Sequence, residues 1–267
     1  MTDVSTQKDE VLVERRGPVQ WVTFNRPQAR NAMTWYMYDR LVEVCEEVNQ
    51  DRDVRALVLT GAPGDKPAFV AGTDISQFRS FSTEQDALDY EARGNHVTRT
   101  LEGVRVPTIA AIAGPCTGGG AGLAACCDLR IGSPSARYGF PIARTLGNCL
   151  SSLNYARLFT LLGMAKTKDI IFRARLMDAR EMLASGLLSE LVDSEEALWP
   201  RAQELGEQLA QHAPLTMQVT KEALHRVRDR LLPEDDRDLI LTCYMSADFK
   251  EGMEAFLAKR RPEWRGE

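Results

Sequence analysis

Two glycine-containing turns are the part of this sequence best suited to chemistry. The first lies in residues 69–75, and the second lies in residues 112–123, which contain three consecutive glycines. In each, an apolar strand-like run is followed by glycine and then by a helix start. Glycine lets the backbone approach a ligand closely, and the first N–H groups of a helix lack partners within it. Two such turns facing one cleft form an oxyanion hole, which stabilises a thioester enolate or a tetrahedral oxyanion.

Glycine-rich turns also occur where a helix merely packs tightly on a strand. For either turn alone that simpler interpretation is preferred, but the presence of both favours the functional one. The sequence has no GxGxxG after a first strand, no GK[ST] after the glycines and no GxSxG. It therefore argues against a dinucleotide site, a P-loop and a serine hydrolase.

Composition excludes several other classes. The 267 residues include six cysteines without a CxxC pair and only three histidines, so we expect reduced thiols and no metal centre. The net charge of −5 does not favour nucleic-acid binding. No apolar run approaches the roughly 20 residues that span a bilayer, so we expect no membrane partner. Residues 1–10 are polar and lack a signal-peptide core, and we expect a cytoplasmic protein.

Strands alternate with helices up to about residue 135, which is typical of an α/β fold. Residues 11–15 and 19–24 predict a β-hairpin. Helical spacing predicts a helix over 33–49, with Asn31 as its N-cap. The other predicted strands are 54–59, 68–70, 107–113 and 127–131, and the other predicted helices are 82–104, 121–125, 154–162, 166–172, 179–185 and 197–228. The last third is predicted to be entirely helical.

Several segments form an ordered set of motifs along the chain. They are Asn25-Arg-Pro27, Asn31-Ala32 and residues 68–75, 107–120, 127–131, 179–187 and 251–260. This set resembles the crotonase superfamily, the family of enoyl-CoA hydratases and isomerases. The resemblance runs nearly from end to end, and the set as a whole is highly specific.

The resemblance implies an α/β fold with a ββα spiral core over residues 1–200. It also implies a helical region over 201–267, through which the chain forms a homotrimer or a homohexamer. It places the oxyanion-hole N–H groups on Thr73 and Gly119. It implies an acyl-CoA substrate, as in fatty acid metabolism, with coenzyme A as part of that substrate and no permanently bound cofactor. The implied coenzyme A-binding residues are Gln28, Arg30, Ala71, Asp74, Ile75, Gly118, Gly122, Pro141, Ile142, Phe256 and Lys259.

The sequence departs from the family pattern where the hydratases carry two glutamates. The corresponding positions here are Gly122 and Ile142. Neither residue can transfer a proton, and a positioned acid or base is typically worth about 10²–10⁴ in rate. We therefore expect slow hydration and a changed reaction on the same type of substrate.

Four side chains are candidate replacements for the missing acid/base pair. Glu91 and His96 lie on the helix after the first turn, and Arg144 and Cys149 lie in the loop after Ile142. For His96 a surface or satisfied histidine is at least as well supported as a catalytic one. Arg144 can bind a substrate carboxylate or pair with an acid at the trimer surface. Cys149 without a basic neighbour stays mostly a thiol. Two functions remain open. One is an acyl-CoA lyase or isomerase with an atypical acid/base set, and the other is a catalytically silent acyl-CoA-binding or assembly protein.

Overall fold

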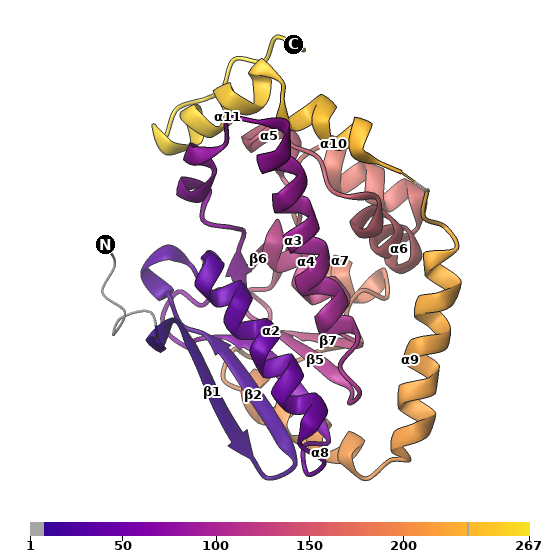
Figure 1. Cartoon of the computed structure of the whole chain (residues 1–267). Coiled ribbons are helices and arrows are strands. Elements are labelled where there is room, and N and C mark those ends of the chain that lie inside the picture. The colour runs from indigo at the N-terminus through magenta and orange to yellow at the C-terminus, as the bar shows by residue number, and fades with distance from the viewer. Residues whose placement is uncertain (1–7, 234) are drawn as a thin grey trace.

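The computed structural model describes residues 8–233 and 235–267 (Figure 1). Within these ranges a larger sheet has the strand order β1-β2-β3-β5-β7-β10, and a smaller sheet has the order β4-β6-β8-β9. The strands are β1 (Val11–Arg16), β2 (Val19–Phe24), β3 (Ala56–Gly61), β4 (Val70–Ala71), β5 (Thr108–Ile112), β6 (Pro115–Thr117), β7 (Leu129–Gly132), β8 (Arg137–Gly139), β9 (Met177–Asp178) and β10 (Glu190–Leu191).

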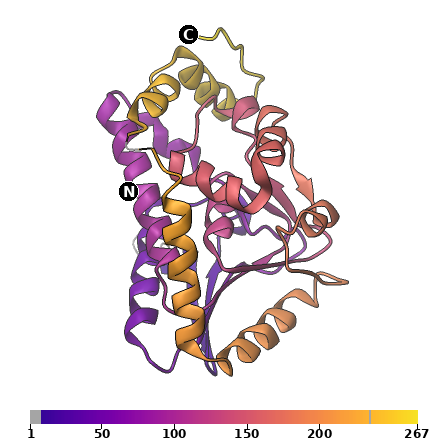
Figure 2. The same ribbon diagram turned by 90° about the vertical axis from the view of Figure 1, so that its right-hand side faces the viewer.

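Helices surround the two sheets and dominate the C-terminal part of the chain (Figures 1 and 2). The α-helices are α2 (Trp35–Gln50), α3 (Glu84–Glu102), α4 (Gly119–Cys126), α5 (Ile142–Thr145), α6 (Ser152–Phe172), α7 (Ala179–Ala184), α8 (Leu198–Ala210), α9 (Pro214–Asp229), α10 (Arg237–Tyr244) and α11 (Ala247–Leu257). The short 3₁₀ helices are η1 (Lys8–Glu10), η2 (Pro27–Ala29) and η3 (Ile75–Ser80). In the part of the chain that the structure describes, none of the helices is long and apolar enough to cross a membrane.

The larger sheet starts with the predicted hairpin and continues as a parallel sheet. β1 pairs antiparallel with β2, and β2, β3, β5 and β7 pair in parallel, with Trp21 opposite Val58. Successive residues of a strand point to opposite faces of the sheet. Leu57 of β3 therefore packs in the core that contains α2, whereas Val58 packs with Leu198 of α8. β3 and β5 are buried along their whole length because helices pack on both faces of the sheet.

Three of the parallel strands are each followed by a strand of the smaller sheet and then by a helix. β3 leads to β4 and α3, β5 leads to β6 and α4, and β7 leads to β8 and α5. This is the repeated ββα turn that the resemblance implies, and it confirms the predicted fold class. Because β4 and β6 are parallel neighbours, with Ala71 opposite Thr117, the two glycine turns that follow them leave the smaller sheet at the same edge.

Several predicted helix boundaries are wrong for local reasons. Thr34 caps α2 by accepting a hydrogen bond from the Met37 N–H. The predicted cap, Asn31, instead adopts a left-handed φ of 58° and donates its buried amide to the Ala68 carbonyl at 2.7 Å. The helix predicted over 197–228 is two helices, since Pro214 begins α9. The last third is not entirely helical, because β10 pairs with β7.

Other differences also arise at turns and caps. The helix predicted over 82–104 begins at Glu84, where Thr83 and Asp86 form a capping box. The helices predicted over 154–162 and 166–172 form α6, which is interrupted at Gly163, where φ is 72° and ψ is 164°. Both differences are local and leave the ββα order unchanged.

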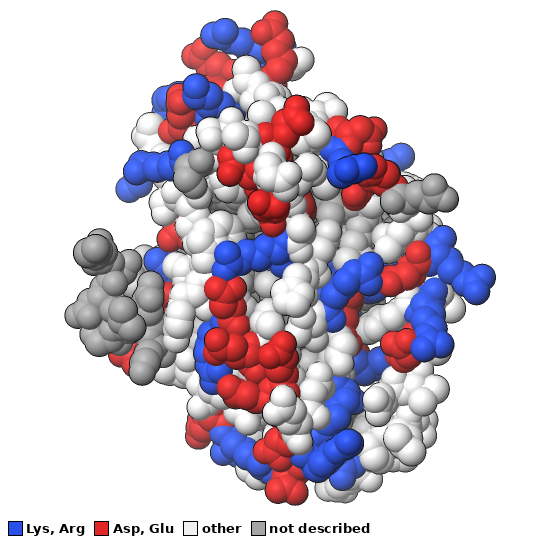
Figure 3. All heavy atoms as spheres, in the orientation of Figure 1, with Lys and Arg blue, Asp and Glu red and all other residues white. Residues whose placement is uncertain are grey.

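The C-terminal helices fold back over the end of α3 (Figure 1). α10 packs against α3, and α11 packs against η3 and α5. The boundary predicted at residue 200 falls inside α8, and that helix packs on the larger sheet through Leu198 and Ala202. On the face in Figure 3, acidic and basic side chains are interspersed.

A buried ion group joins α3, α6 and α9. The Arg157 guanidinium donates to both carboxylate oxygens of Glu102, at 2.7 and 2.8 Å, and Arg228 also donates to Glu102. Burial alone would raise the pKa of Glu102, but the hydrogen bonds and charges of Arg157 and Arg228 lower it. The group is therefore ionised, and each charge depends on the others remaining in place.

Replacing Glu102 tests the contribution of this ion group. Glu102→Ala leaves two buried guanidinium groups without their shared partner, and we expect it to lower the free energy of unfolding by about 3–5 kcal/mol. Glu222→Ala is the control, since it removes the partner of the exposed Arg226 and should change little. Urea denaturation checks both variants. Equal effects would contradict a structural role for the buried group.

Candidate active site

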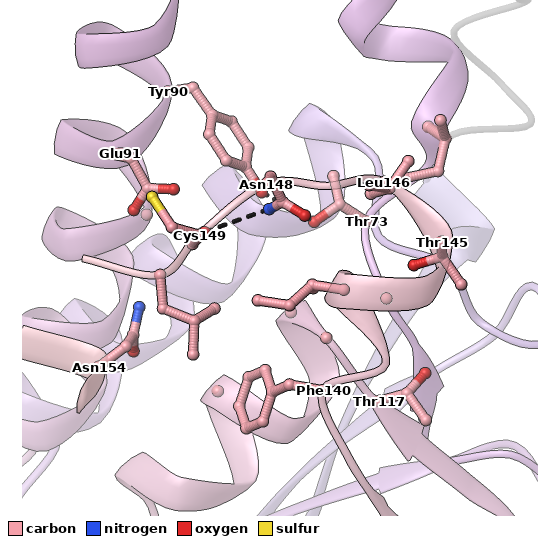
Figure 4. Close-up of a pocket in the computed structure, with 18 of the residues that line it drawn as sticks. Thr73, Tyr90, Glu91, Thr117, Phe140, Thr145, Leu146, Asn148, Cys149 and Asn154 are labelled. Atoms are coloured by element: carbon pink, nitrogen blue, oxygen red, sulfur yellow. Dashed lines mark hydrogen bonds between the residues drawn. The ribbon is translucent and has the colours of Figure 1, made fainter. Parts of the chain in front are cut away.

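A cavity of about 180 Å³ lies beside the two glycine turns (Figure 4). Its walls come from the β4–η3 turn, the start of α4, one face of α3, residues 140–150, and two C-terminal side chains, Tyr244 and Phe256. Most of the lining is apolar. The large apolar residues of the lining are Ile75, Phe78, Val97, Leu123, Phe140, Ile142, Leu146, Leu150 and Phe256.

The two glycine turns lie against each other at this cavity. Gly72 and Gly118 have positive φ angles of 91° and 53°, which glycine adopts readily. Thr73 and Gly119 follow them, and neither backbone N–H donates to another described residue. A Cβ atom built on Gly119 would lie 3.6 Å from the Thr73 nitrogen. Two unsatisfied N–H donors therefore lie close together in the cavity wall.

The Thr73 side chain is held within the protein. Its hydroxyl is hydrogen-bonded to the Tyr38 hydroxyl at 2.8 Å and lies 3.4 Å from the Tyr90 hydroxyl. Tyr38 comes from α2 and Tyr90 from α3, so both helices anchor the first turn. This anchoring fixes the backbone of Thr73.

Glu91 is the one carboxyl side chain among the described residues that line the cavity. It projects from α3 and is 7% exposed. The Tyr244 hydroxyl donates to its Oε1 at 2.6 Å, and the Ser151 backbone N–H also donates to its carboxyl group. Burial raises the pKa of Glu91 to about 7, although both hydrogen bonds oppose that rise. A group with this pKa can accept or donate a proton near neutral pH.

The other acid/base candidates are placed differently. Cys149 lines the cavity, but a hydrogen bond to Cys243 and burial raise the pKa of its thiol, so it stays protonated. His96 lies on the exposed side of α3, and Arg144 is exposed on α5. Neither is among the lining residues. The structure thus brings Glu91 and Cys149 together and leaves His96 and Arg144 outside the cavity.

The residues implied for coenzyme A binding also divide into two groups. Those that line the cavity are Ala71, Ile75, Gly118, Gly122, Pro141, Ile142 and Phe256. Gln28, Arg30, Asp74 and Lys259 are not among the lining residues. The Arg30 carbonyl accepts from the Ala71 N–H at 3.0 Å, so η2 lies directly beside β4. The Asp74 carboxylate accepts from Ser76 and Arg26, so it orders its own turn.

The partners of Glu91 and Thr73 lie far from them in the sequence. Tyr244 is separated from Glu91 by 153 residues, and Tyr38 is separated from Thr73 by 35. No local pattern marks either tyrosine as part of a site. Over the described ranges, there is no cluster of three or more His, Cys, Asp or Glu side chains that could hold a metal ion.

The ββα spiral and the paired glycine turns define a protein of the crotonase type. A family model described as enoyl-CoA hydratase/isomerase matches residues 14–267. The chain therefore belongs to the enoyl-CoA hydratase/isomerase family, whose substrates are coenzyme A thioesters.

Individual relatives agree with this assignment. The chain is 35% identical to the short-chain-enoyl-CoA hydratase of Clostridium acetobutylicum, over 96% of this chain and 97% of that protein. It is 32% identical to the crotonyl-CoA hydratase of Syntrophomonas wolfei, over 95% and 96%. A solved structure of methylmalonyl-CoA decarboxylase in complex with 2-nitronate-propionyl-CoA superposes with a TM-score of 0.87 at 27% identity, over 97% and 99%. The similar proteins thus include both hydratases and a decarboxylase.

Adding a methyl group at Gly119 tests the arrangement of the two turns. In Gly119→Ala the new Cβ would clash with the Tyr38 hydroxyl and lie 3.0 Å from the Thr73 Oγ1. We expect the Thr73 turn to shift and pentanoyl-CoA binding to weaken about tenfold or more, as loss of a hydrogen bond would cause. Calorimetry measures the affinity.

Gly64→Ala is the matched control, in an exposed turn outside the cavity lining. A Cβ atom there would have no heavy atom within 4 Å. This variant should keep its affinity for pentanoyl-CoA. If both variants bind equally well, the Gly119 turn is not part of the binding site.

Proposed function

We propose that this protein catalyses proton transfer on an acyl-CoA substrate, as an isomerase or lyase of its family. The thioester carbonyl accepts hydrogen bonds from the Thr73 and Gly119 N–H groups, and Glu91 moves the proton. The observation that carries the proposal is that Glu91 is the sole carboxyl group in the described lining of a cavity that also holds two unsatisfied N–H donors.

The physical chemistry of these groups supports proton abstraction next to the carbonyl. Two fixed N–H donors stabilise the enolate that forms when the α-carbon loses a proton. A carboxyl group with a pKa of about 7 is a stronger base than one with an ordinary pKa, and it is still partly ionised at neutral pH. Apolar neighbours such as Leu123 and Phe140 keep bulk water away from the reacting carbons.

Double-bond isomerisation suits this set of groups better than hydration. One carboxyl group can take a proton from one carbon and return it to another. Hydration also requires a positioned water, and the two hydratase glutamates correspond to Gly122 and Ile142, which have no proton to give. A catalytically silent acyl-CoA-binding protein is the alternative outcome.

The cavity and the two N–H donors also define where coenzyme A binds in this proposal. We place the acyl group in the cavity and the thioester at Thr73 and Gly119. The rest of coenzyme A then passes Ala71 and Phe256 towards the exposed Arg30 and Lys259, whose charges suit phosphate.

Turnover assays at several pH values test the acid/base assignment. We expect 3-pentenoyl-CoA to be converted to 2-pentenoyl-CoA, with a rate that rises with pH through about 7 as Glu91 ionises. Glu91→Gln should lower the rate by about 10²–10⁴, which is the usual contribution of one acid/base group. Glu84→Gln, an exposed change on the same helix, is the control and should leave the rate unchanged.

Three results would contradict this account in different ways. Full activity of Glu91→Gln would exclude Glu91 as the acid/base. Hydration of crotonyl-CoA near the diffusional ceiling of about 10⁸ M⁻¹s⁻¹ would show that Gly122 and Ile142 are not lost catalytic positions. Tight binding without turnover of any acyl-CoA would support the silent binding protein.

We also propose that the chain forms a homotrimer or homohexamer. Large apolar side chains of α9 are strongly exposed in the single chain: Leu215 at 72%, Val219 at 64%, Leu224 at 62% and Val227 at 67%. An apolar surface of this kind is typical of an interface. Light scattering should give three or six times the chain mass of 29.8 kDa, and a monomer would contradict the proposal.

A further inference from the structure

Three hydroxyl groups meet at the first glycine turn. The Thr73 Oγ1 lies 2.8 Å from the Tyr38 Oη and 3.4 Å from the Tyr90 Oη. Among the described residues these are the only hydrogen bonds that the three oxygens make. Each hydrogen bond uses the proton of one hydroxyl group. Three protons therefore serve two hydrogen bonds, and one proton has no acceptor in the described part of the chain.

Burial determines which proton is left over. Tyr38 is 8% exposed and Thr73 is 7% exposed, whereas Tyr90 is half-buried. The Tyr38 hydroxyl donates to the Thr73 Oγ1, because its buried proton would otherwise be unpaired. The Thr73 hydroxyl accepts this hydrogen bond and donates its own proton to the Tyr90 Oη. The proton of Tyr90 is the one that remains.

The Tyr90 side chain lines the cavity and keeps its proton. In Figure 4 its ring extends from α3 towards Thr73. The rings of Trp35 and Phe78 pack edge-on against it, at centroid distances of 5.7 and 4.8 Å, and hold it in this orientation. Burial raises the pKa of Tyr90 well above its ordinary value, so the hydroxyl is neutral near pH 7. A ligand in the cavity can therefore accept a hydrogen bond from it.

The free proton lies beside the two unsatisfied N–H donors. A Cβ atom built on Gly119 would lie 3.0 Å from the Thr73 Oγ1 and 3.6 Å from the Thr73 nitrogen. The Thr73 hydroxyl and the two N–H groups thus share one corner of the cavity wall, and the Tyr90 Oη is 3.4 Å from that hydroxyl. An oxygen bound at this corner is the nearest acceptor that a substrate offers to Tyr90.

We propose that Tyr90 is a further catalytic residue, whose hydroxyl donates a hydrogen bond to the thioester oxygen. The inference rests on the proposed function, which places that oxygen at the Thr73 and Gly119 N–H groups. When Glu91 takes the α-proton, the electron pair of the broken C–H bond moves towards the oxygen, and the enolate accepts three hydrogen bonds. The Tyr90 proton stays on Tyr90. A donor aimed at developing charge stabilises the transition state more than the bound substrate.

Removing the hydroxyl separates catalysis from binding. Tyr90→Phe keeps the ring and its packing, and we expect kcat for 3-pentenoyl-CoA to fall by about 10²–10³, as when one oxyanion donor is removed. The Kd of pentanoyl-CoA, measured by calorimetry, should rise by no more than about tenfold, the usual effect of one neutral hydrogen bond. Tyr36→Phe is the matched control. It removes a tyrosine hydroxyl from α2 outside the cavity lining and should change neither value.

The carbonyl stretch of a bound thioester reports the hydrogen bond itself, because each hydrogen bond to a carbonyl oxygen lowers its vibrational frequency. Infrared difference spectra of pentanoyl-CoA with and without ¹³C at the carbonyl isolate this band. We expect a higher frequency on Tyr90→Phe than on wild type, and the wild-type frequency on Tyr36→Phe. A Tyr90 hydroxyl that instead binds a water, or a group further along the acyl chain, would leave the frequency unchanged.

The possible failures can be told apart. If wild type binds or converts no acyl-CoA, the proposed function itself fails. If wild type converts 3-pentenoyl-CoA and Tyr90→Phe keeps the same kcat, the inference is overturned while the proposed function stands. A lower kcat with an unchanged carbonyl frequency also overturns it, because the hydroxyl then acts away from the thioester. A Kd for pentanoyl-CoA that rises as much as kcat falls contradicts the preference for the enolate.

Discussion

The hydrogen bond between Tyr244 and Glu91 is the contact on which the candidate site depends. A buried carboxyl group needs partners, and this one receives the Tyr244 hydroxyl at 2.6 Å and the Ser151 N–H. Tyr244 reaches Glu91 only because α10 packs on α3. The C-terminal helices therefore do more than cover the core, since Tyr244 and Phe256 complete the cavity wall and the Tyr244 hydrogen bond limits the rise in the pKa of Glu91 that burial causes.

The two unpaired N–H donors of the cavity wall and the carboxyl group come from separate parts of the fold. The donors follow β4 and β6, which are neighbours in the smaller sheet, whereas Glu91 lies on the helix that connects β4 to β5. The ββα repeat thus holds the two N–H groups in place, while a helix side chain supplies the carboxyl group. This separation explains how similar folds appear among hydratases and a decarboxylase.

Local signals in the sequence predict much of the fold. Apolar runs bounded by Gly and Pro predict the hairpin and the buried strands, and the glycines of residues 69–75 and 112–123 predict the two turns beside the cavity. Long-range contacts left no such signal, so the roles of Tyr244 and Tyr38 could not be predicted. Asn31 failed as a helix cap because its amide is used to hold the Ala68 carbonyl. The helical spacing in α3 does separate two of the candidates. Glu91 follows the buried Ala87 by four residues and shares its buried face of the helix, whereas His96 does not.

Hydrogen exchange at the α-carbon is the sharpest test of Glu91 as the base, because it detects proton removal whatever product forms later. The protein is incubated with 3-pentenoyl-CoA in D₂O, and deuterium at C2 of the recovered ester is measured by mass spectrometry. We expect rapid incorporation with wild type, and incorporation slower by about 10² or more with Glu91→Gln under conditions where the ester is bound. Equal incorporation by the two proteins, or none with wild type despite binding, would contradict the claim that Glu91 removes a proton next to a carbonyl held by Thr73 and Gly119.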